Sequence, residues 1–256
     1  MTAVVGGASS GLGAAIAHEL ARRGHDLLLW SRGQERLDLV AAELRARHGV
    51  AAHTLTADAG DPAAAQAVAE AALDRLGHVD VLVLNAGGPP PAPADATDAD
   101  GWRAALQLLT VTPIDLATRL LPGMRERGHG RIVAVLSSGV REPLPDLSYS
   151  NGGRAALTAW LKTVGRLVAG DGVTVNGVVP GRIDTERVAA LDAARARRTG
   201  TDAAAVRAAA MADIPAGRYG RPEEFAAVVG FLSSPEASYV TASLLSCDGG
   251  LMRSLT

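Results

Sequence analysis

Short apolar runs alternate with longer stretches of helical periodicity along the whole chain. The apolar runs occupy residues 3–5, 27–30, 51–56, 79–84, 132–136, 173–179 and 243–247, the run at 51–56 being the weakest. They stand more than ten residues apart, which is typical of parallel strands joined by helical crossovers. The stretches between them predict helices at about residues 12–23, 34–48, 62–76, 99–127, 150–169 and 222–232, with a polar pair within 185–212. About seven strands with helices on both sides predict a three-layer, Rossmann-type α/β fold around a doubly wound parallel sheet.

No shift in composition divides the chain, so residues 1–256 are expected to form a single dinucleotide-binding domain. The proline-rich piece 88–93 directly follows a predicted strand. It is interpreted as a loop over the carboxyl edge of the sheet, with a linker as the alternative. Residues 185–215 are rich in alanine and arginine and follow the sixth strand. They are predicted to form a substrate lid, or alternatively a pair of solvated helices.

Composition and charge exclude several classes of protein. Apolar residues make up 48% of the chain, charged residues 20%, and the formal net charge is −2, so neither nucleic acid nor an anionic membrane is an expected partner. No signal peptide is visible, and no apolar run reaches about 18 residues, so no membrane span is expected. The single cysteine, Cys247, allows no disulfide within the chain and fits a cytoplasmic location. The six histidines lack metal-ligand spacing, and no metal site is predicted.

A glycine-rich loop joins the first predicted strand to the first predicted helix. It reads Gly7-Ala8-Ser9-Ser10-Gly11-Leu12-Gly13. A tight turn and a close approach to a pyrophosphate both exclude a Cβ, and a helix N-terminus supplies free N–H groups. We therefore expect this loop to bind a dinucleotide, the alternative being a purely structural turn. The predicted contacts are Gly7, Ser9, Ser10, Gly11, Leu12 and Gly13.

The end of the second predicted strand favours NADP(H) over NAD(H). Enzymes that prefer NAD usually have an acidic residue there, which binds the ribose hydroxyls. This chain has Ser31 and Arg32 instead. A guanidinium suits a 2′-phosphate, so both residues are predicted to bind the cofactor. The alternative for Arg32 is a solvated residue at a helix start.

Further motifs follow in order along the chain. They are Asp58 after the third strand, Asn85-Ala86-Gly87 after the fourth, Gly130-Arg131-Ile132-Val133 leading to Ser137, Asn176 in the sixth strand, Pro180-Gly181-Arg182-Ile183-Asp184-Thr185, and Cys247-Asp248-Gly249-Gly250. Together with the glycine loop, they resemble the short-chain dehydrogenase/reductase family over essentially the whole chain. The resemblance implies hydride transfer between a nicotinamide and a small carbonyl or alcohol, and a homotetramer or homodimer. It also implies cofactor contacts at Asp58, Ala59, Asn85, Ala86, Gly87, Pro180, Gly181, Ile183 and Thr185.

The catalytic positions depart from the family pattern, which is an Asn on a long helix, a Ser, and a Tyr-x-x-x-Lys pair. The thirteen-residue step from Ser137 to Ser150 matches the usual step from serine to tyrosine. The resemblance therefore places Ser150 at the tyrosine position and Arg154 at the lysine position. Counting seven from Trp102 places Leu109 where the Asn would be. The chain resembles a divergent branch of the family with a Ser-x-x-x-Arg motif.

This set leaves the proton donor open between Ser150, Tyr149 and water. Ser150 and Arg154 are four residues apart and share one face of a helix. A serine hydroxyl donates a hydrogen bond but is a poor proton source, and an arginine keeps its charge without relaying protons. Tyr149 would point about 100° away from Ser150 if both are helical, whereas its direction is free if it lies in a loop. Asn151 and Asp146 are weaker candidates, for which turn or capping roles are the alternative.

The sequence therefore predicts an NADP(H)-dependent oxidoreductase whose candidate catalytic residues are Ser137, Ser150, Arg154 and Tyr149. One alternative keeps the pocket but performs a non-redox dehydration, cyclisation or epimerisation. A second alternative is a non-catalytic NADP-binding protein.

Overall fold

The computed structural model describes residues 1–254, which contain one parallel sheet of seven strands in the order β3-β2-β1-β4-β5-β6-β7. The strands are β1 (Thr2–Gly6), β2 (Asp26–Ser31), β3 (Ala52–Thr56), β4 (Val81–Leu84), β5 (Gly130–Val135), β6 (Val173–Pro180) and β7 (Leu244–Cys247). After β3 the chain returns to the other side of β1, where β4 pairs with it. Ligands of doubly wound sheets bind at the carboxyl ends of strands beside such a reversal. The predicted fold is confirmed.

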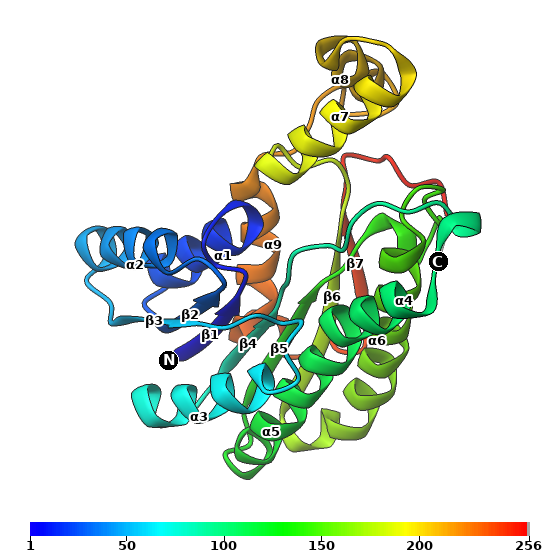
Figure 1. Cartoon of the computed structure of the whole chain (residues 1–256). Coiled ribbons are helices and arrows are strands. Elements are labelled where there is room, and N and C mark those ends of the chain that lie inside the picture. Colours follow the sequence, from blue (N-terminus) through cyan, green and yellow to red (C-terminus); the bar gives the residue numbers. More distant parts are fainter. Residues whose placement is uncertain (255–256) are drawn as a thin grey trace.

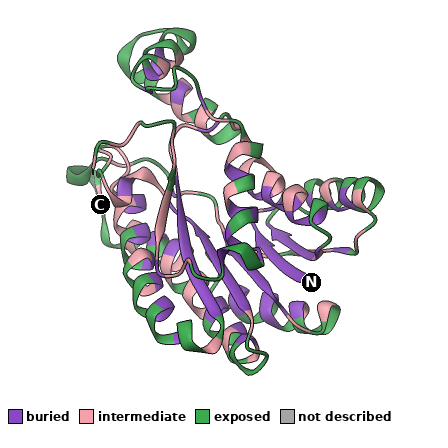
Figure 2. Cartoon of the chain, turned by 180° about the vertical axis from the view of Figure 1, so that it is seen from behind, coloured by how far each residue is buried: buried purple, intermediate pink, exposed green. Residues whose placement is uncertain are grey.

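Two layers of helices cover the sheet (Figure 1). The helices are α1 (Gly11–Arg22), α2 (Gln34–His48), α3 (Ala64–Leu76), α4 (Ala99–Leu106), α5 (Thr112–Glu126), α6 (Ser148–Val168), α7 (Glu186–Thr199), α8 (Ala203–Ala212) and α9 (Pro222–Leu232). The apolar faces of α1, α2 and α9 pack on one side of the sheet, and those of α3, α5 and α6 pack on the other. The inner strands β1, β2, β4, β5 and β6 are therefore buried on both faces, as Figure 2 shows, which explains why their sequences are apolar runs rather than alternating patterns.

A π-helical segment, Gln107–Val111, joins α4 to α5. The sequence predicted an unbroken helix here, and the combined helix Ala99–Glu126 is indeed continuous. By length and composition alone it is apolar enough to cross a bilayer, which is weak evidence because buried core helices meet the same two criteria. One face of it packs into the core through Leu116, Leu120 and Met124, as in an ordinary covering helix of the sheet.

Two glycines near the start of α6 allow this helix to lie close against α4 and the π-helical segment that follows it. A Cβ on Gly152 would come within 2.6 Å of the Trp102 ring, and one on Gly153 would come within 3.0 Å of the Leu109 Cβ. The Thr110 hydroxyl donates a hydrogen bond to the Gly153 carbonyl at 2.8 Å. This close approach explains why glycines stand at these two positions, although glycine within a helix lowers its stability.

Helices α7 and α8 project from the carboxyl edge of the sheet (Figure 1). They enclose a small core of their own, centred on Ala210, Ile214 and Tyr219. Ion pairs tie them to the loop after β6: Arg207 pairs with Asp184 at 2.7 Å, and Arg182 pairs with Asp192. This projection contains the pair of polar helices predicted within 185–212.

Candidate functional site

The glycine loop has a backbone that only glycine adopts easily. Gly7 and Gly11 have positive φ angles of 59° and 54°, in the left-handed region that favours glycine. A Cβ on Gly13 would overlap the carbonyl oxygen of Gly7. Ser10 is the N-cap of α1 but makes no side-chain capping bond, and the first turn holds no acidic residue. The free N–H groups of this turn therefore remain available to an anion.

A cleft of about 550 Å³ runs from this loop across the carboxyl ends of the central strands. It brings together twelve of the predicted cofactor residues: Gly7, Ser10, Gly11, Leu12, Gly13, Asn85, Ala86, Gly87, Pro180, Gly181, Ile183 and Thr185. Three of the four predicted catalytic residues, Ser137, Ser150 and Arg154, line the same cleft. The phosphate-binding loop and the predicted reacting groups therefore face one continuous space.

The remaining predicted cofactor residues, Ser9, Ser31, Arg32, Asp58 and Ala59, do not line that cleft. Ser31 is buried at the end of β2, and its hydroxyl accepts a hydrogen bond from the Gly33 N–H at 3.3 Å. Arg32 is exposed beside it. Asp58 is also exposed, and its carboxylate accepts the Gly60 N–H at 2.9 Å. Ser31 and Arg32 lie at the end of β2 and Asp58 follows β3, and both strands lie on the side of β1 opposite to β4.

Asn85, which follows β4, connects that strand to the neighbouring strand β1. Its side-chain amide donates a hydrogen bond to the Gly6 carbonyl at 2.9 Å. The same amide nitrogen would lie 2.9 Å from a Cβ on Gly13. Asn85 therefore stabilises the base of the glycine loop in addition to lining the cleft.

The reacting end of the cleft is formed by β5 and α6. Ser137 follows β5 directly, and its hydroxyl accepts a hydrogen bond from the Gly139 N–H at 3.2 Å. Ser150 and Arg154 lie one turn apart on α6 and are both 8% exposed. Their shared face points into the cleft, as their four-residue spacing predicted.

Arg154 is a buried cation held in place by backbone carbonyls. Its guanidinium donates hydrogen bonds to the carbonyl of Val135 and, more weakly at 3.5 Å, to that of Ala86. Burial lowers the pKa of Arg154 to about 10, and the charge of Arg187 contributes to the same direction. Within residues 1–254 no carboxylate pairs with Arg154. The side chain thus presents a fixed, uncompensated positive charge to the cleft.

Tyr149 does not reach this site, and its prediction as a proton donor is contradicted by its position. Helix α6 begins at Ser148, so Tyr149 and Ser150 are both helical and point about 100° apart. The phenol oxygen accepts a hydrogen bond from the Asp98 N–H at 2.9 Å. Its ring packs edge-on against Trp102 with centroids 5.1 Å apart. Tyr149 therefore joins α6 to α4 as a packing residue.

The weaker polar candidates also have structural roles. The Asn151 amide donates a hydrogen bond to the Leu144 carbonyl at 2.9 Å. Asp146 pairs with Arg198 of α7 at 2.6 Å. Leu109, at the position of the family's Asn, is 3% exposed and shares with Arg154 the wall of a small cavity of about 20 Å³. It contributes no polar group there.

Several residues that line the cleft were not predicted as site residues from the sequence. Arg187, Leu191 and Arg195 of α7 all line the cleft. Their spacing of four residues was a visible signal of one helical face, but the sequence does not show which element that face covers. Leu144, Leu147, Leu251 and Met252 add apolar walls from other parts of the chain.

Comparisons with known proteins agree with this geometry. Residues 7–252 match the family model described as enoyl-(acyl carrier protein) reductase. The chain is 32% identical over 250 residues to 3-oxoacyl-(acyl-carrier-protein) reductase FabG of Vibrio cholerae, covering 97% of this chain and 96% of that protein. It superimposes on YwfH, an NADPH-dependent reductase involved in bacilysin biosynthesis, with a TM-score of 0.95, 30% identity and 99% of both chains covered.

A third similar protein is an NADPH-bound short-chain oxidoreductase of Pseudomonas aeruginosa PAO1. Its TM-score is 0.87 at 31% identity, with 99% of this chain and 97% of that chain covered, and its structure is described as containing an atypical catalytic center. The chain therefore belongs to the short-chain dehydrogenase/reductase family, whose named members are oxidoreductases acting on carbonyl and hydroxyl groups. The predicted family and enzyme class are confirmed, and the preference for NADP(H) agrees with these NADPH-dependent relatives. The catalytic role of the Ser-x-x-x-Arg motif stays a prediction.

Proposed function

We propose that the chain is an NADP(H)-dependent oxidoreductase that transfers hydride between the nicotinamide and a small carbonyl or alcohol substrate. The observation that carries this proposal is that the glycine loop and the Ser137–Ser150–Arg154 group line a single cleft. Phosphate binding and carbonyl activation are then joined by one continuous space, of the size that small-molecule sites have.

The residues present fit the cofactor. The loop at Gly7–Gly13 makes a turn so tight that a Cβ on Gly13 would overlap the Gly7 carbonyl, and the first turn of α1 offers free N–H groups to a pyrophosphate. Arg32 binds the 2′-phosphate, with the neighbouring Ser31, Asp58 and Ala59 forming the adenine end. When bound, NADPH supplies the hydride.

The substrate oxygen binds between Ser137 and Ser150. Both hydroxyls donate hydrogen bonds to it, and Arg154 stabilises the negative charge that develops there. Because the guanidinium of Arg154 is already held by the Val135 carbonyl, the Arg154 side chain does not have to move during the reaction. Arg154 also orients the ribose beside the nicotinamide.

The proton comes from water by way of Ser150. As the carbonyl carbon gains hydride, its oxygen takes the Ser150 hydroxyl proton, and water restores that proton. This route is slow because an alcohol is a much weaker acid than a phenol, and losing a competent general acid costs about 10²–10⁴ in rate. The proposal therefore predicts a functional but slow reductase.

The test follows NADPH absorbance with a panel of aldehydes and ketones and quantifies the alcohol formed. We expect one alcohol per NADPH consumed, and a loss of turnover in Ser137→Ala and Ser150→Ala. Ser148→Ala is the matched control, since Ser148 lies on the same helix but not in the cleft. Tight NADPH binding without consumption above background for any carbonyl would contradict the proposal.

A non-redox reaction is the second candidate, and one observation favours it: the phenol next to Ser150 in sequence, Tyr149, bonds to the Asp98 N–H and does not line the cleft. A buried guanidinium and two hydroxyls can stabilise an enolate or alkoxide in a dehydration, cyclisation or epimerisation without net redox. New product without NADPH consumption would identify this case.

Residues 185–215 act as a lid in this proposal. Arg187 of α7 donates a hydrogen bond to the Pro89 carbonyl at 3.0 Å, and Arg198 near the other end of α7 pairs with Asp146. Both contacts join α7 to the loops on the opposite side of the cleft. The Arg198–Asp146 pair is exposed, and breaking an exposed ion pair costs little free energy.

Self-association into a homotetramer or homodimer, in the cytoplasm, completes the proposal. Leu106 and Val111 lie on the outer side of the α4–α5 helix and are 37% and 49% exposed. An apolar face of this kind is typical of an interface between subunits. Sedimentation of the purified protein tests it, and a monomer at micromolar concentration would contradict it.

A further inference from the structure

One face of α7 forms a charged and apolar stripe along the cleft. Arg187, Leu191 and Arg195 follow one another at four-residue steps and all line the cleft. Leu144 and Leu147 of the loop before α6 line it as well. Arg198 pairs with Asp146 of that loop at 2.6 Å, which joins the outer end of the stripe to it. This side of the cleft is therefore lined by Leu144 and Leu147 together with the Arg187–Leu191–Arg195 face of α7.

The cofactor accounts for the cation at the inner end. The Arg187 guanidinium lies 3.0 Å from the place where a Cβ of Gly88 would be, immediately after the Asn85-Ala86-Gly87 motif. Its charge contributes to the lowered pKa of Arg154, so the two guanidinium groups repel each other in the absence of an anion. The phosphates of the dinucleotide would relieve this repulsion.

Nothing in the cofactor accounts for Arg195. It lies eight residues farther along α7, roughly 12 Å at 1.5 Å per residue. Within residues 1–254 no ion pair includes Arg195, although the neighbouring Arg182 and Arg198 each have a carboxylate partner. Arg195 is therefore an exposed arginine that lines the cleft and has no ion-pair partner in the described part of the chain.

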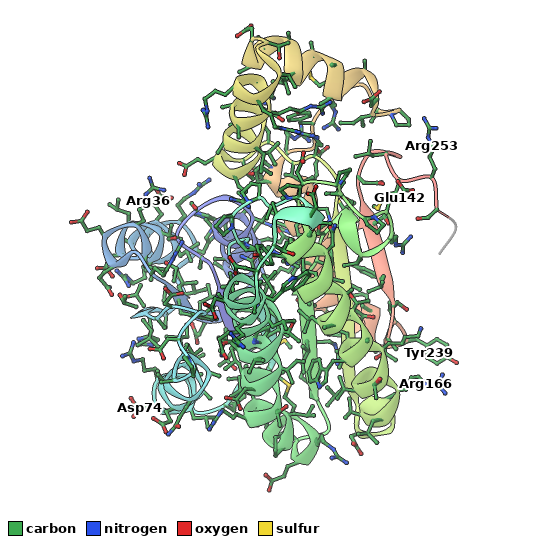
Figure 3. The ribbon with its side chains drawn as sticks, turned by 45° about the vertical axis from the view of Figure 1, so that its right-hand side comes forward. Arg36, Asp74, Glu142, Arg166, Tyr239 and Arg253 are labelled. Atoms are coloured by element: carbon green, nitrogen blue, oxygen red, sulfur yellow. The ribbon has the colours of Figure 1, made fainter. Side chains whose placement is uncertain are left out.

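The carboxylates of the cleft do not fill that role. Glu142 accepts hydrogen bonds from the N–H groups of Arg253 and Ser254, at 2.9 and 3.0 Å. Figure 3 shows Glu142 and Arg253 on the side of the molecule where the C-terminal segment passes. Glu186 pairs with Arg36 of α2 at 3.1 Å. Asp213 lines the cleft as well but makes no ion pair within residues 1–254.

We propose that the substrate carries an anionic group, a carboxylate or a phosphate, at the end of an apolar segment, and that Arg195 binds this group. The substrate carbonyl then lies at Ser137 and Ser150, and the apolar segment lies between Leu191 and Leu147. This inference rests on the proposed function for the carbonyl chemistry but not for the binding of the anion. A guanidinium pairs with carboxylates and phosphates through two parallel hydrogen bonds, which gives direction as well as affinity.

The experiment compares substrates that differ only in charge. Levulinate and its longer methyl-ketone homologues are each assayed beside their methyl esters, and dihydroxyacetone phosphate beside dihydroxyacetone. The wild type should reduce at least one acid or phosphate with a higher kcat/KM than its neutral counterpart. Arg195→Met should lower that kcat/KM about 10- to 100-fold, the worth of a hydrogen bond to a charged group, and leave the neutral substrate unchanged. Arg195→Lys should restore part of the loss.

Arg197→Met is the matched control, because Arg197 is exposed on the same helix but does not line the cleft. It should change neither substrate. Equal kcat/KM for charged and neutral substrates in the wild type would overturn the inference, as would an equal loss for both in Arg195→Met. The acid and phosphate pairs show which anion is preferred.

Calorimetric titration of the same compounds into the NADPH-loaded protein separates this inference from the proposed function. If an acid binds, and Arg195→Met abolishes that binding without any reduction being observed, the anion site stands and the redox proposal fails. If no acid or phosphate binds more tightly than its neutral counterpart, the anion site is refuted whatever the outcome of the redox assay.

Discussion

In the proposed mechanism, replacing Ser150 by tyrosine should raise the rate of carbonyl reduction. Ser150 lines the cleft and is 8% exposed, so a phenol on this position extends into the space of about 550 Å³ rather than into the core. Arg154, one turn away on the same face, places a positive charge close to the new hydroxyl. That charge favours the phenolate and lowers the phenol's pKa from about 10 toward neutrality.

The size of the gain follows from the chemistry that the phenol restores. A positioned general acid is worth about 10²–10⁴ in rate, or about 2.7–5.4 kcal/mol at 1.36 kcal/mol per factor of ten. We expect the lower end of this range, about 10²-fold in kcat. The reason is that Arg154 does not relay protons and Leu109 provides no polar group to extend the relay.

The assay measures single-turnover reduction of a reactive ketone by NADPH across a range of pH. Ser150→Phe is the matched control, because it adds the same ring without the hydroxyl. The tyrosine variant alone should lose rate as the pH rises through the pKa of the phenol. Tyr149→Phe should leave kcat unchanged, since its hydroxyl bonds to the Asp98 N–H. Equal rates for Ser150→Tyr and Ser150→Phe at every pH would refute the assignment of position 150 as the proton-donor position.

Three further changes test the cofactor site and the stability of the fold. Gly13→Ala should weaken NADPH binding at least tenfold and destabilise the protein by about 1–3 kcal/mol, because the new Cβ meets the Gly7 carbonyl. Gly33→Ala is the control, since its Cβ meets nothing within 4 Å. Calorimetry measures the binding, and urea unfolding measures the stability. Arg32→Ala should raise the Kd for NADPH about 10- to 100-fold and leave the Kd for NADH unchanged, and an equal effect on both cofactors would contradict the 2′-phosphate assignment. Burial lowers the pKa of His25 in the folded state. The unfolded chain therefore binds a proton at His25 below about pH 6.5, whereas the folded state binds it only at lower pH. The free energy of unfolding falls as the pH drops below about 6.5 for this reason. His25→Asn should reduce the stability lost between about pH 7 and pH 5 in urea titrations, and an unchanged loss would show that other groups cause it.

The strands and the glycine loop could be predicted from the sequence because each depends on residues within one short segment. Strands buried on both faces need apolar runs, so β1, β4, β5 and β6 were predicted within a few residues. The glycine loop was equally readable, because a left-handed backbone and a close approach leave a compositional signature. Family resemblance then placed Ser137, Ser150 and Arg154 in one site, and the cleft contains all three.

Tertiary structure decided which side chains meet. The direction of Tyr149 depended on where α6 begins, and the chain starts that helix at Ser148 rather than at Ser150 as predicted. One helical residue is a rotation of about 100°, enough to move a phenol from the cleft to the Asp98 N–H. That rotation is set by packing against α4, a contact across about fifty positions of sequence.

The sequence by itself thus determined the fold, the family and the cofactor loop, since each depends on periodicity or on residues within one short segment. Only the tertiary structure decided that the Ser150 hydroxyl, and not the neighbouring Tyr149 phenol, lines the cleft. It also decided that Arg187 and Arg195 line the cleft. The sequence shows that these residues share one face of a helix, but it does not show which part of the protein that face packs against.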